Sequence, residues 1–301
     1  MSAFFPRIVC SFAVQYRGKS SLGGFFMQTF VNPLKLKDSA ASLHAYLHDK
    51  TNPSSSTENR LPAVIIVPGG AYTHIPETQA EDLALAFYNQ GYQAFYLRYS
   101  FLGESQPLMP KPIVELSSAI KMLRDHAGEW KLNPARIATA GFSVGGHIAA
   151  LQNDYWQAEW LANDATASND QIKPDAVILS YPVISPQLGY PTEQSTIEKW
   201  SANPTAIAAD LHVSQQNSPT FIWGTSDDPT VPVANALAYI NALSQAKVPF
   251  EAHLFDHGPH GLALANQVTA WEPEANSPHV AHWLNLALEW LDHVWDNQPD
   301  D

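Results

Sequence analysis

Ser143 stands between two glycines in the segment TAGFSVGGHIAA, where an apolar run gives way to a helical pattern. The spacing Gly141-x-Ser143-x-Gly145 predicts a sharp turn from a strand into a helix that holds the serine Oγ in the open. Glycines on both sides let the backbone turn tightly and let neighbouring elements approach. Because the same motif also occurs by chance in ordinary turns, a nucleophilic role depends on the residues around it.

His260 is the residue that we expect to activate this serine. A serine hydroxyl is a weak nucleophile near neutral pH and needs a base within hydrogen-bond reach. Histidine suits that role because its pKa lies close to neutrality. His257, nearer to the preceding predicted strand, is the alternative base and is otherwise an ordinary loop histidine.

A carboxylate is needed to hold the imidazole in the right tautomer. Asp227 and Asp228 are adjacent, and both lie between the serine and the histidines in the chain. Counting forward from Gly224 selects Asp227, whereas counting back from Val231-Pro232 selects Asp228, which we prefer. The other aspartate is expected to be a loop-capping carboxylate, since Asp side chains accept hydrogen bonds from nearby backbone amides in turns.

Attack by the serine places negative charge on the substrate's carbonyl oxygen, which fixed backbone N–H groups must stabilise. Val144 follows the nucleophile directly, and Gly69 and Gly70 end an earlier apolar run. We expect these three residues to form the oxyanion hole, with a plain tight turn as the alternative for the two glycines.

Other side chains near these motifs either line a substrate pocket or belong to the framework. They are Tyr72, His74, Tyr181 and Trp271. His147 lies one turn into the helix that follows the serine, and we expect it to pack or to support its neighbours rather than to act as the base.

The candidate residues lie at the ends of predicted strands. Strand patterns alternate with helical ones, the strands at 61–70, 92–100, 135–143, 175–184, 219–228 and 249–258 and the helices at 77–91, 111–130, 233–248 and 279–295. This alternation predicts an α/β fold with a mostly parallel sheet that carries helices on both faces. Ligands of such sheets bind beyond the carboxyl ends of the strands, so the four motifs are expected to meet there.

Four further stretches complete the predicted organisation. Residues 42–48 alternate in the manner of an exposed antiparallel strand, and residues 53–59 form a polar turn. Residues 155–172 and 185–215 are polar and irregular, which is typical of excursions over a sheet rather than of separate domains.

A single domain over residues 27–301 is therefore expected. Residues 1–26 have no basic region before their short apolar run, so they make a poor signal peptide. We expect them to be a peripheral extension or the result of a start codon placed too early.

Charge and composition limit the partners. The net charge of −13, from 29 acidic and 16 basic residues, disfavours nucleic acid and anionic membrane surfaces. No apolar run is long enough for a transmembrane helix. Cys10 is the only cysteine, and neither a phosphate-binding loop nor an H-E-x-x-H motif occurs, so we expect no disulfide, metal or cofactor. These features suit a cytoplasmic protein, and they leave its oligomeric state open.

Four motifs resemble those of α/β-hydrolases, in the esterase branch near the acetyl-xylan-esterase-like and hormone-sensitive-lipase-like enzymes. They are VPGGAY as the oxyanion loop, GFSVGGHIAA around the nucleophile, GTSDDPTVPV as the acid loop and HLFDHGPHGLALA as the histidine loop. The resemblance covers residues 60–295, and the order Ser…Asp…His is that of the α/β-hydrolase fold. Pro68 and Ala71 stand where lipase-type loops carry histidine and a third glycine, which favours the small carbohydrate-esterase-like group.

The resemblance implies a serine esterase that hydrolyses small acyl esters, among them acetyl esters of sugars or xylo-oligosaccharides, through Ser143, Asp228 and His260. It implies a small-molecule ester as the partner and no cofactor. A peptidase of the prolyl-oligopeptidase kind and an amide or formamide hydrolase with the same triad are alternatives. A hydrolase fold without catalysis, serving as a binding module, is the alternative from another class.

Overall fold

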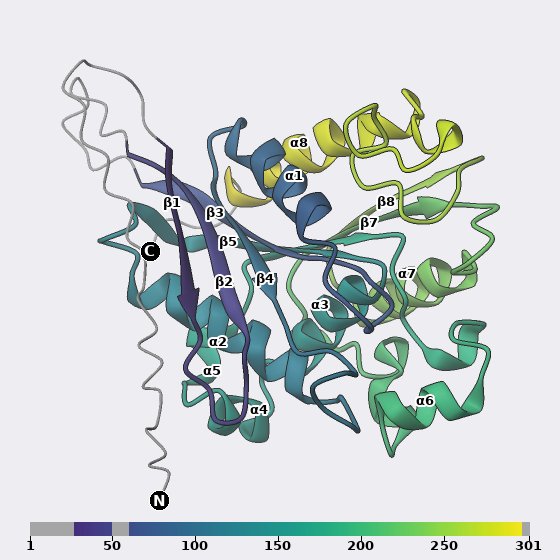
Figure 1. Cartoon of the computed structure of the whole chain (residues 1–301), viewed down its shortest axis with the longest axis horizontal. Coiled ribbons are helices and arrows are strands. Elements are labelled where there is room, and N and C mark those ends of the chain that lie inside the picture. The colour runs from purple at the N-terminus through teal and green to yellow at the C-terminus, as the bar shows by residue number, and fades with distance from the viewer. Residues whose placement is uncertain (1–26, 50–59, 297–301) are drawn as a thin grey trace, which may run out of the picture.

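An eight-stranded sheet forms the centre of the computed structural model, which describes residues 27–49 and 60–296 (Figure 1). The strands are β1 (Met27–Pro33), β2 (Ser42–His48), β3 (Leu61–Val67), β4 (Gln93–Arg98), β5 (Leu132–Phe142), β6 (Ala176–Ser180), β7 (Thr220–Thr225) and β8 (Phe250–Phe255). Their order is β1-β2-β4-β3-β5-β6-β7-β8. β2 is antiparallel to both of its neighbours, β1 and β4, and the pairings among the other six strands, β3 to β8, are all parallel. The predicted α/β fold with a mostly parallel sheet is confirmed.

Side chains that alternate along the central strands supply a core on each face of the sheet. In β3, Ile65 and Val67 belong to one buried cluster, and Val64 and Ile66 belong to the other. This alternation follows from the period of two residues in a strand. Both faces are therefore apolar and must be covered, which is why β3 is a continuous hydrophobic run.

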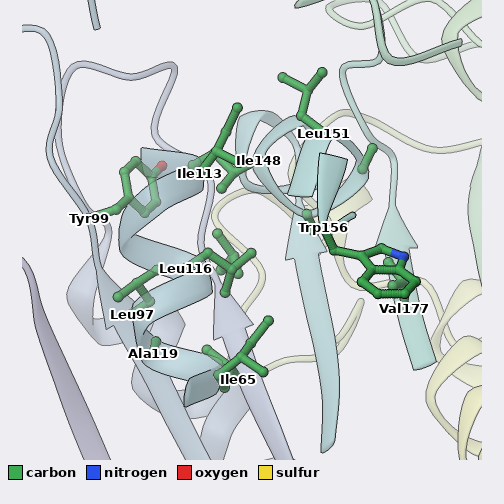
Figure 2. Close-up of a cluster of buried hydrophobic side chains, with 14 of the residues drawn as sticks. Ile65, Leu97, Tyr99, Ile113, Leu116, Ala119, Ile148, Leu151, Trp156 and Val177 are labelled. Atoms are coloured by element: carbon green, nitrogen blue, oxygen red, sulfur yellow. The ribbon is translucent and has the colours of Figure 1, made fainter. Parts of the chain in front are cut away.

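Helices cover both faces, as Figure 1 shows. One face carries α2 (Lys111–Asp125), α3 (Val144–Tyr155) and α7 (Ala234–Ala246), and the other carries α1 (Glu77–Tyr88) and α8 (Trp283–Asp296). Figure 2 shows part of the first face, where Leu116 of α2 and Ile148 of α3 lie in one cluster with Ile65 and Leu97 of the sheet. This packing fixes the start of α3, directly after Ser143, against the sheet.

The two irregular stretches contain short helices. They are α4 (Glu159–Asp164), α5 (Asn169–Ile172) and α6 (Gln194–Trp200), with the 3-10 turns η1 (Pro186–Leu188), η2 (Pro204–Ile207) and η3 (Ala209–Leu211). Trp200 and Ile207 are buried in the core of the α2–α3 face. The second stretch therefore packs into the domain and does not only pass over its surface.

The predicted antiparallel strand at 42–48 exists as β2, but the expected exposure is wrong. Leu43 and Ala45 are buried because they belong to the core cluster of the α2–α3 face. β2 is also not an edge strand, because β1, a strand that the sequence analysis did not predict, pairs along its outer edge. β1 itself is mostly exposed and has little apolar pattern, which explains why it gave no signal. The expectations for residues 1–26 and 53–59 fall outside the described residues.

No helix within residues 27–49 and 60–296 has both the length and the apolar character to cross a membrane.

Candidate active site

Ser143 occupies the turn between β5 and α3, at the carboxyl end of the parallel sheet. Its φ of 56° is left-handed, which is unusual for a residue with a side chain. Two hydrogen bonds hold it there: its N–H donates to the carbonyl of Ser180 at 3.0 Å, and its carbonyl accepts from the N–H of Val183 at 3.1 Å. Both partners belong to β6 or the loop after it, so the neighbouring strand fixes the turn.

The glycines of the motif are required by close packing. A Cβ on Gly145 would lie 2.0 Å from the carbonyl oxygen of Val67, and one on Gly141 would lie 2.4 Å from that of Gly145. Gly146 has the same constraint, because a Cβ there would lie 2.6 Å from Pro182. The start of α3 therefore lies too close to the sheet for any side chain at these positions.

Ser143, His260 and Asp228 form one continuous set of hydrogen bonds. Ser143 Oγ lies 2.7 Å from His260 Nε2, and His260 Nδ1 lies 2.7 Å from Asp228 Oδ2. The Asp228 side chain is 3% exposed, and its Oδ1 accepts from the N–H groups of Thr230 at 2.8 Å and Val231 at 2.9 Å. Because a carboxylate can only accept, Nδ1 carries the ring proton and Nε2 is left as an acceptor for the serine O–H.

The histidine ring is held on its other sides as well. The ring of Tyr181 lies edge-on to His260, with centroids 5.1 Å apart and an interplanar angle of 78°. The Tyr181 hydroxyl accepts from the N–H of Ala263 at 3.0 Å, which ties the histidine loop to the segment after β6. Trp271 donates its indole N–H to the carbonyl of His260 at 3.3 Å. Tyr181 and Trp271, both expected near the site, therefore contact its base or its backbone.

The second aspartate, Asp227, accepts a hydrogen bond from a loop backbone amide, and that amide belongs to the loop that carries the histidines. Its Oδ1 accepts from the N–H of Gly258 at 2.9 Å, and its Oδ2 bonds to Nδ1 of His257. It therefore links the acid loop to the histidine loop, whereas Asp228 accepts from the backbone of its own turn. The hydrogen bond between Asp227 and His257 lowers the pKa of the carboxyl and raises that of the imidazole. His257, the alternative base, faces this carboxylate instead of the serine.

The predicted oxyanion residues lie beside the nucleophile. A Cβ built on Gly69 would lie 3.2 Å from Ser143 Cβ and 3.8 Å from its Oγ, so the backbone of Gly69 approaches the reacting atom directly. Gly70 has a φ of 104°, and a Cβ there would lie 2.1 Å from the carbonyl oxygen of His74. Within the described residues the N–H groups of Gly69, Gly70 and Val144 have no hydrogen-bond acceptor. They are the kind of donors that a developing oxyanion needs.

The remaining candidates separate into buried and exposed residues. Tyr72 and His147 are fully buried and bonded to each other, so they belong to the framework. Burial lowers the pKa of His147 to about 4, which suits the expectation that it supports its neighbours. His74 is exposed and bonds to the hydroxyl of Thr73. The Tyr72–His147 contact was not foreseen, because nothing in the sequence pairs residues 75 positions apart.

Among the described residues, no group of three His, Cys, Asp or Glu side chains is placed to hold a metal ion.

Comparison with known proteins agrees with this geometry. The family model BD-FAE matches residues 49–243, more than half of the chain. The endo-1,4-beta-xylanase B of Butyrivibrio fibrisolvens is 32% identical over 231 residues, which make up 75% of this chain and 35% of that protein. The chain thus spans only about a third of the length of this curated relative.

Two solved structures are similar over nearly their whole length. A protein of Lactobacillus plantarum WCFS1 assigned as a carboxylesterase is 50% identical, with a TM-score of 0.73, over 90% of this chain and 99% of that chain. The acetyl ester-xyloside bifunctional hydrolase of Caldicellulosiruptor lactoaceticus is 30% identical, with a TM-score of 0.69, over 85% of this chain and 88% of that chain.

Fold and relatives define the class of the protein as an α/β-hydrolase placed among the carboxylic ester hydrolases. Within that class the chain belongs to the BD-FAE family. The predicted resemblance to α/β-hydrolase esterases is confirmed, and the comparisons support a function like that of carboxylesterases and acetyl ester hydrolases.

Proposed function

We propose that the chain is a serine esterase that works through a covalent acyl-enzyme, with Ser143 as nucleophile, His260 as base and Asp228 as the carboxylate that orients it. The observation that carries the proposal is the unbroken pair of 2.7 Å hydrogen bonds from Ser143 to His260 and from His260 to Asp228. Nucleophile, base and orienting group within hydrogen-bond reach are the signature of an activated serine.

The proposed reaction has two acyl-transfer steps. His260 takes the Oγ proton as Ser143 attacks the ester carbonyl, and the resulting oxyanion is stabilised by the N–H groups of Gly69, Gly70 and Val144. His260 then gives the proton to the leaving alcohol, and the acyl group stays on the serine. Water, deprotonated by the same imidazole, attacks the acyl-enzyme. The bond between the acyl carbon and Oγ then breaks, the imidazolium returns its proton to Ser143, and the acid is released. These steps draw only on protein groups and water.

The proposed substrates are small acyl esters, above all acetyl esters of sugars or xylo-oligosaccharides. The similarity to an acetyl ester-xyloside bifunctional hydrolase supports an acetylated sugar. Ser143 is only 8% exposed, which supports a restricted approach of the substrate to its Oγ. A partner of this kind is a small molecule, and the net charge of −13 argues against nucleic acid or an anionic membrane.

A labelling experiment tests the proposed nucleophile. A fluorophosphonate probe should label the wild-type protein rapidly and should not label Ser143→Ala, which should also fail to hydrolyse p-nitrophenyl acetate. Equal labelling or hydrolysis by Ser143→Ala would refute the proposal. Absence of both in the folded wild type would favour the inactive binding module.

A substrate panel tests the proposed ester class. Among p-nitrophenyl esters from acetate to decanoate, kcat/KM should be highest for the shortest acyl groups, and acetylated xylo-oligosaccharides should release acetate. Faster turnover of matched anilides than of esters would favour the amide hydrolase or the peptidase. A maximum at decanoate would contradict a short acyl group.

A further inference from the structure

The oxyanion loop, residues 69–72, has a backbone that requires support from its surroundings. Gly70, Ala71 and Tyr72 have successive positive φ angles of 104°, 53° and 59°. The left-handed region suits glycine but is disfavoured for alanine and tyrosine. Residues held in that region persist only where surrounding contacts fix them, and such residues cluster at functional sites.

Tyr72 supplies one set of these contacts, in addition to the Tyr99 hydroxyl, which lies 2.8 Å from the carbonyl oxygen of Gly69. The Tyr72 side chain is fully buried and lies edge-on to Trp200, with ring centroids 4.8 Å apart. Its hydroxyl lies 3.0 Å from Nδ1 of His147 and 3.2 Å from the carbonyl oxygen of Val144. The hydroxyl therefore connects the oxyanion loop to the first turn of α3, which supplies the other oxyanion donor.

The other ring nitrogen of His147, Nε2, determines which partner donates in the hydrogen bond between Tyr72 and His147. Nε2 lies 2.6 Å from the carbonyl oxygen of Ile207, which can only accept, so Nε2 carries the proton. The ring is neutral at neutral pH because burial lowers its pKa to about 4. Nδ1 consequently presents a lone pair, and the single proton of the Tyr72 hydroxyl is shared between Nδ1 and the carbonyl oxygen of Val144. The loop is thus anchored through His147 to η2.

We infer that Tyr72 and His147 are positioning residues that hold the two halves of the oxyanion hole, the glycine loop and the N-terminus of α3, at a fixed separation. Loss of the Tyr72 hydroxyl would let the loop leave its left-handed conformation and withdraw the N–H groups of Gly69 and Gly70. The hydrogen bonds from Ser143 to His260 and from His260 to Asp228 do not involve Tyr72 or His147 and would persist.

This inference rests on the proposed function, because an oxyanion forms only if Ser143 attacks a carbonyl. The link between Tyr72 and His147 would affect the stability of the tetrahedral transition states and not that of the bound ester. A change in such an interaction lowers kcat and leaves KM nearly unchanged.

Tyr72→Phe, with Tyr239→Phe as the matched control, tests the role of the hydroxyl. Both tyrosines are fully buried, and the hydroxyl of Tyr239 donates to Asp154 in a different part of the domain. With p-nitrophenyl acetate we expect about a tenfold lower kcat for Tyr72→Phe at unchanged KM, as for the loss of one hydrogen bond. The drop should stay below the roughly 10²–10³-fold cost of an oxyanion donor removed outright. Tyr239→Phe should lower the melting temperature without changing kcat.

Two substitutions of His147 separate the contact to Tyr72 from the contact to Ile207. In His147→Asn the amide oxygen takes the place of Nδ1 and can still accept a hydrogen bond from Tyr72. In His147→Gln the amide nitrogen takes the place of Nε2 and can donate only to the carbonyl of Ile207. We expect His147→Asn to keep more of the wild-type kcat than His147→Gln. The double variant Tyr72→Phe/His147→Gln should lose little more than either single one, because both break the same link.

The outcomes distinguish this inference from the proposed function. If Ser143→Ala is inactive while Tyr72→Phe is folded and keeps the wild-type kcat and rate of fluorophosphonate labelling, the inference alone is overturned. A raised KM at constant kcat, or a higher kcat for His147→Gln than for His147→Asn, would overturn it as well. Hydrolysis by Ser143→Ala at the wild-type rate would instead remove the function on which it rests.

Discussion

The adjacent residues Asp228 and Asp227 offer a matched test of the proposed triad. They have the same side chain, but the Asp228 side chain is 3% exposed and faces His260, whereas that of Asp227 is 47% exposed and faces His257. Substitution of either by asparagine keeps size and shape and removes the negative charge. A difference in kcat between the two variants therefore distinguishes the carboxylate at His260 from the carboxylate at His257, and thermal melting reports separately on their different burial.

The structure determines how the new amide would lie in Asp228→Asn. The present Oδ1 accepts from two backbone N–H groups, those of Thr230 and Val231, so the amide oxygen is retained at that place. The NH2 group then faces Nδ1 of His260, which must become an acceptor. The ring proton moves to Nε2, where Ser143 needs a base. Rotating the amide to avoid this would place an NH2 group against two N–H groups.

The wrong tautomer costs about 10⁴-fold in kcat in Ser-His-Asp enzymes, or about 5.5 kcal/mol at 1.36 kcal/mol for each factor of ten. For Asp227→Asn we expect kcat within about threefold of wild type, because an exposed charge pair contributes little. Hydrolysis of p-nitrophenyl acetate at neutral pH measures both, with thermal melting as a check of folding. A loss below tenfold in Asp228→Asn, or a larger loss in Asp227→Asn, would refute the assignment of the acid.

Three other predictions concern packing and ionisation. Gly145→Ala should destabilise the domain by more than about 3 kcal/mol and abolish activity, because its Cβ would lie 2.0 Å from a carbonyl oxygen of β3. Gly128→Ala is the control: no atom lies within 4 Å of its Cβ, so this variant should have the melting temperature of the wild type. Burial raises the pKa of Asp154, so unfolding releases its proton and wild-type stability falls as pH rises above the ordinary carboxyl range. Asp154→Asn should remove this dependence of stability on pH. In thermal melts, the stability of the variant relative to wild type should therefore increase from pH 4 to pH 7. An unchanged pH dependence would contradict a raised pKa for Asp154. The raised pKa of His257, followed by NMR, should return toward its ordinary value in Asp227→Asn, and a persistent elevation would exclude Asp227 as its cause.

The sequence predicted most of the sheet because buried parallel strands are continuous apolar runs, as in β3. It also predicted the residues of the candidate site, because Ser143 and His260 lie in short motifs at strand ends. It left Asp227 and Asp228 unresolved, since their spacing supports both and only the contacts of folded loops separate them. The catalytic roles themselves stay predictions until they are tested.

Other features could not have been read from local patterns. β1 is an exposed edge strand without an apolar pattern, and only its pairing with β2 in the folded structure identifies it as a strand. The hydrogen bond between Tyr72 and His147 joins two segments whose sequences are separately unremarkable. The burial of Trp200 shows that a polar, irregular stretch can still contribute to the core. Each of these depends on tertiary contacts rather than on periodicity.

The position of β8 has a consequence for how the enzyme would fail under stress. In the described sheet β8 is the outermost strand on its side and pairs only with β7. His260 follows β8 and Asp228 follows β7, whereas Ser143 follows β5, deeper in the sheet. The edge strands of a sheet open at a lower free energy than its central strands. Mild denaturation that opens the β7–β8 edge of the sheet would therefore abolish hydrolysis while the other strands and helices stay folded. Loss of activity would report the opening of that edge rather than the unfolding of the whole domain.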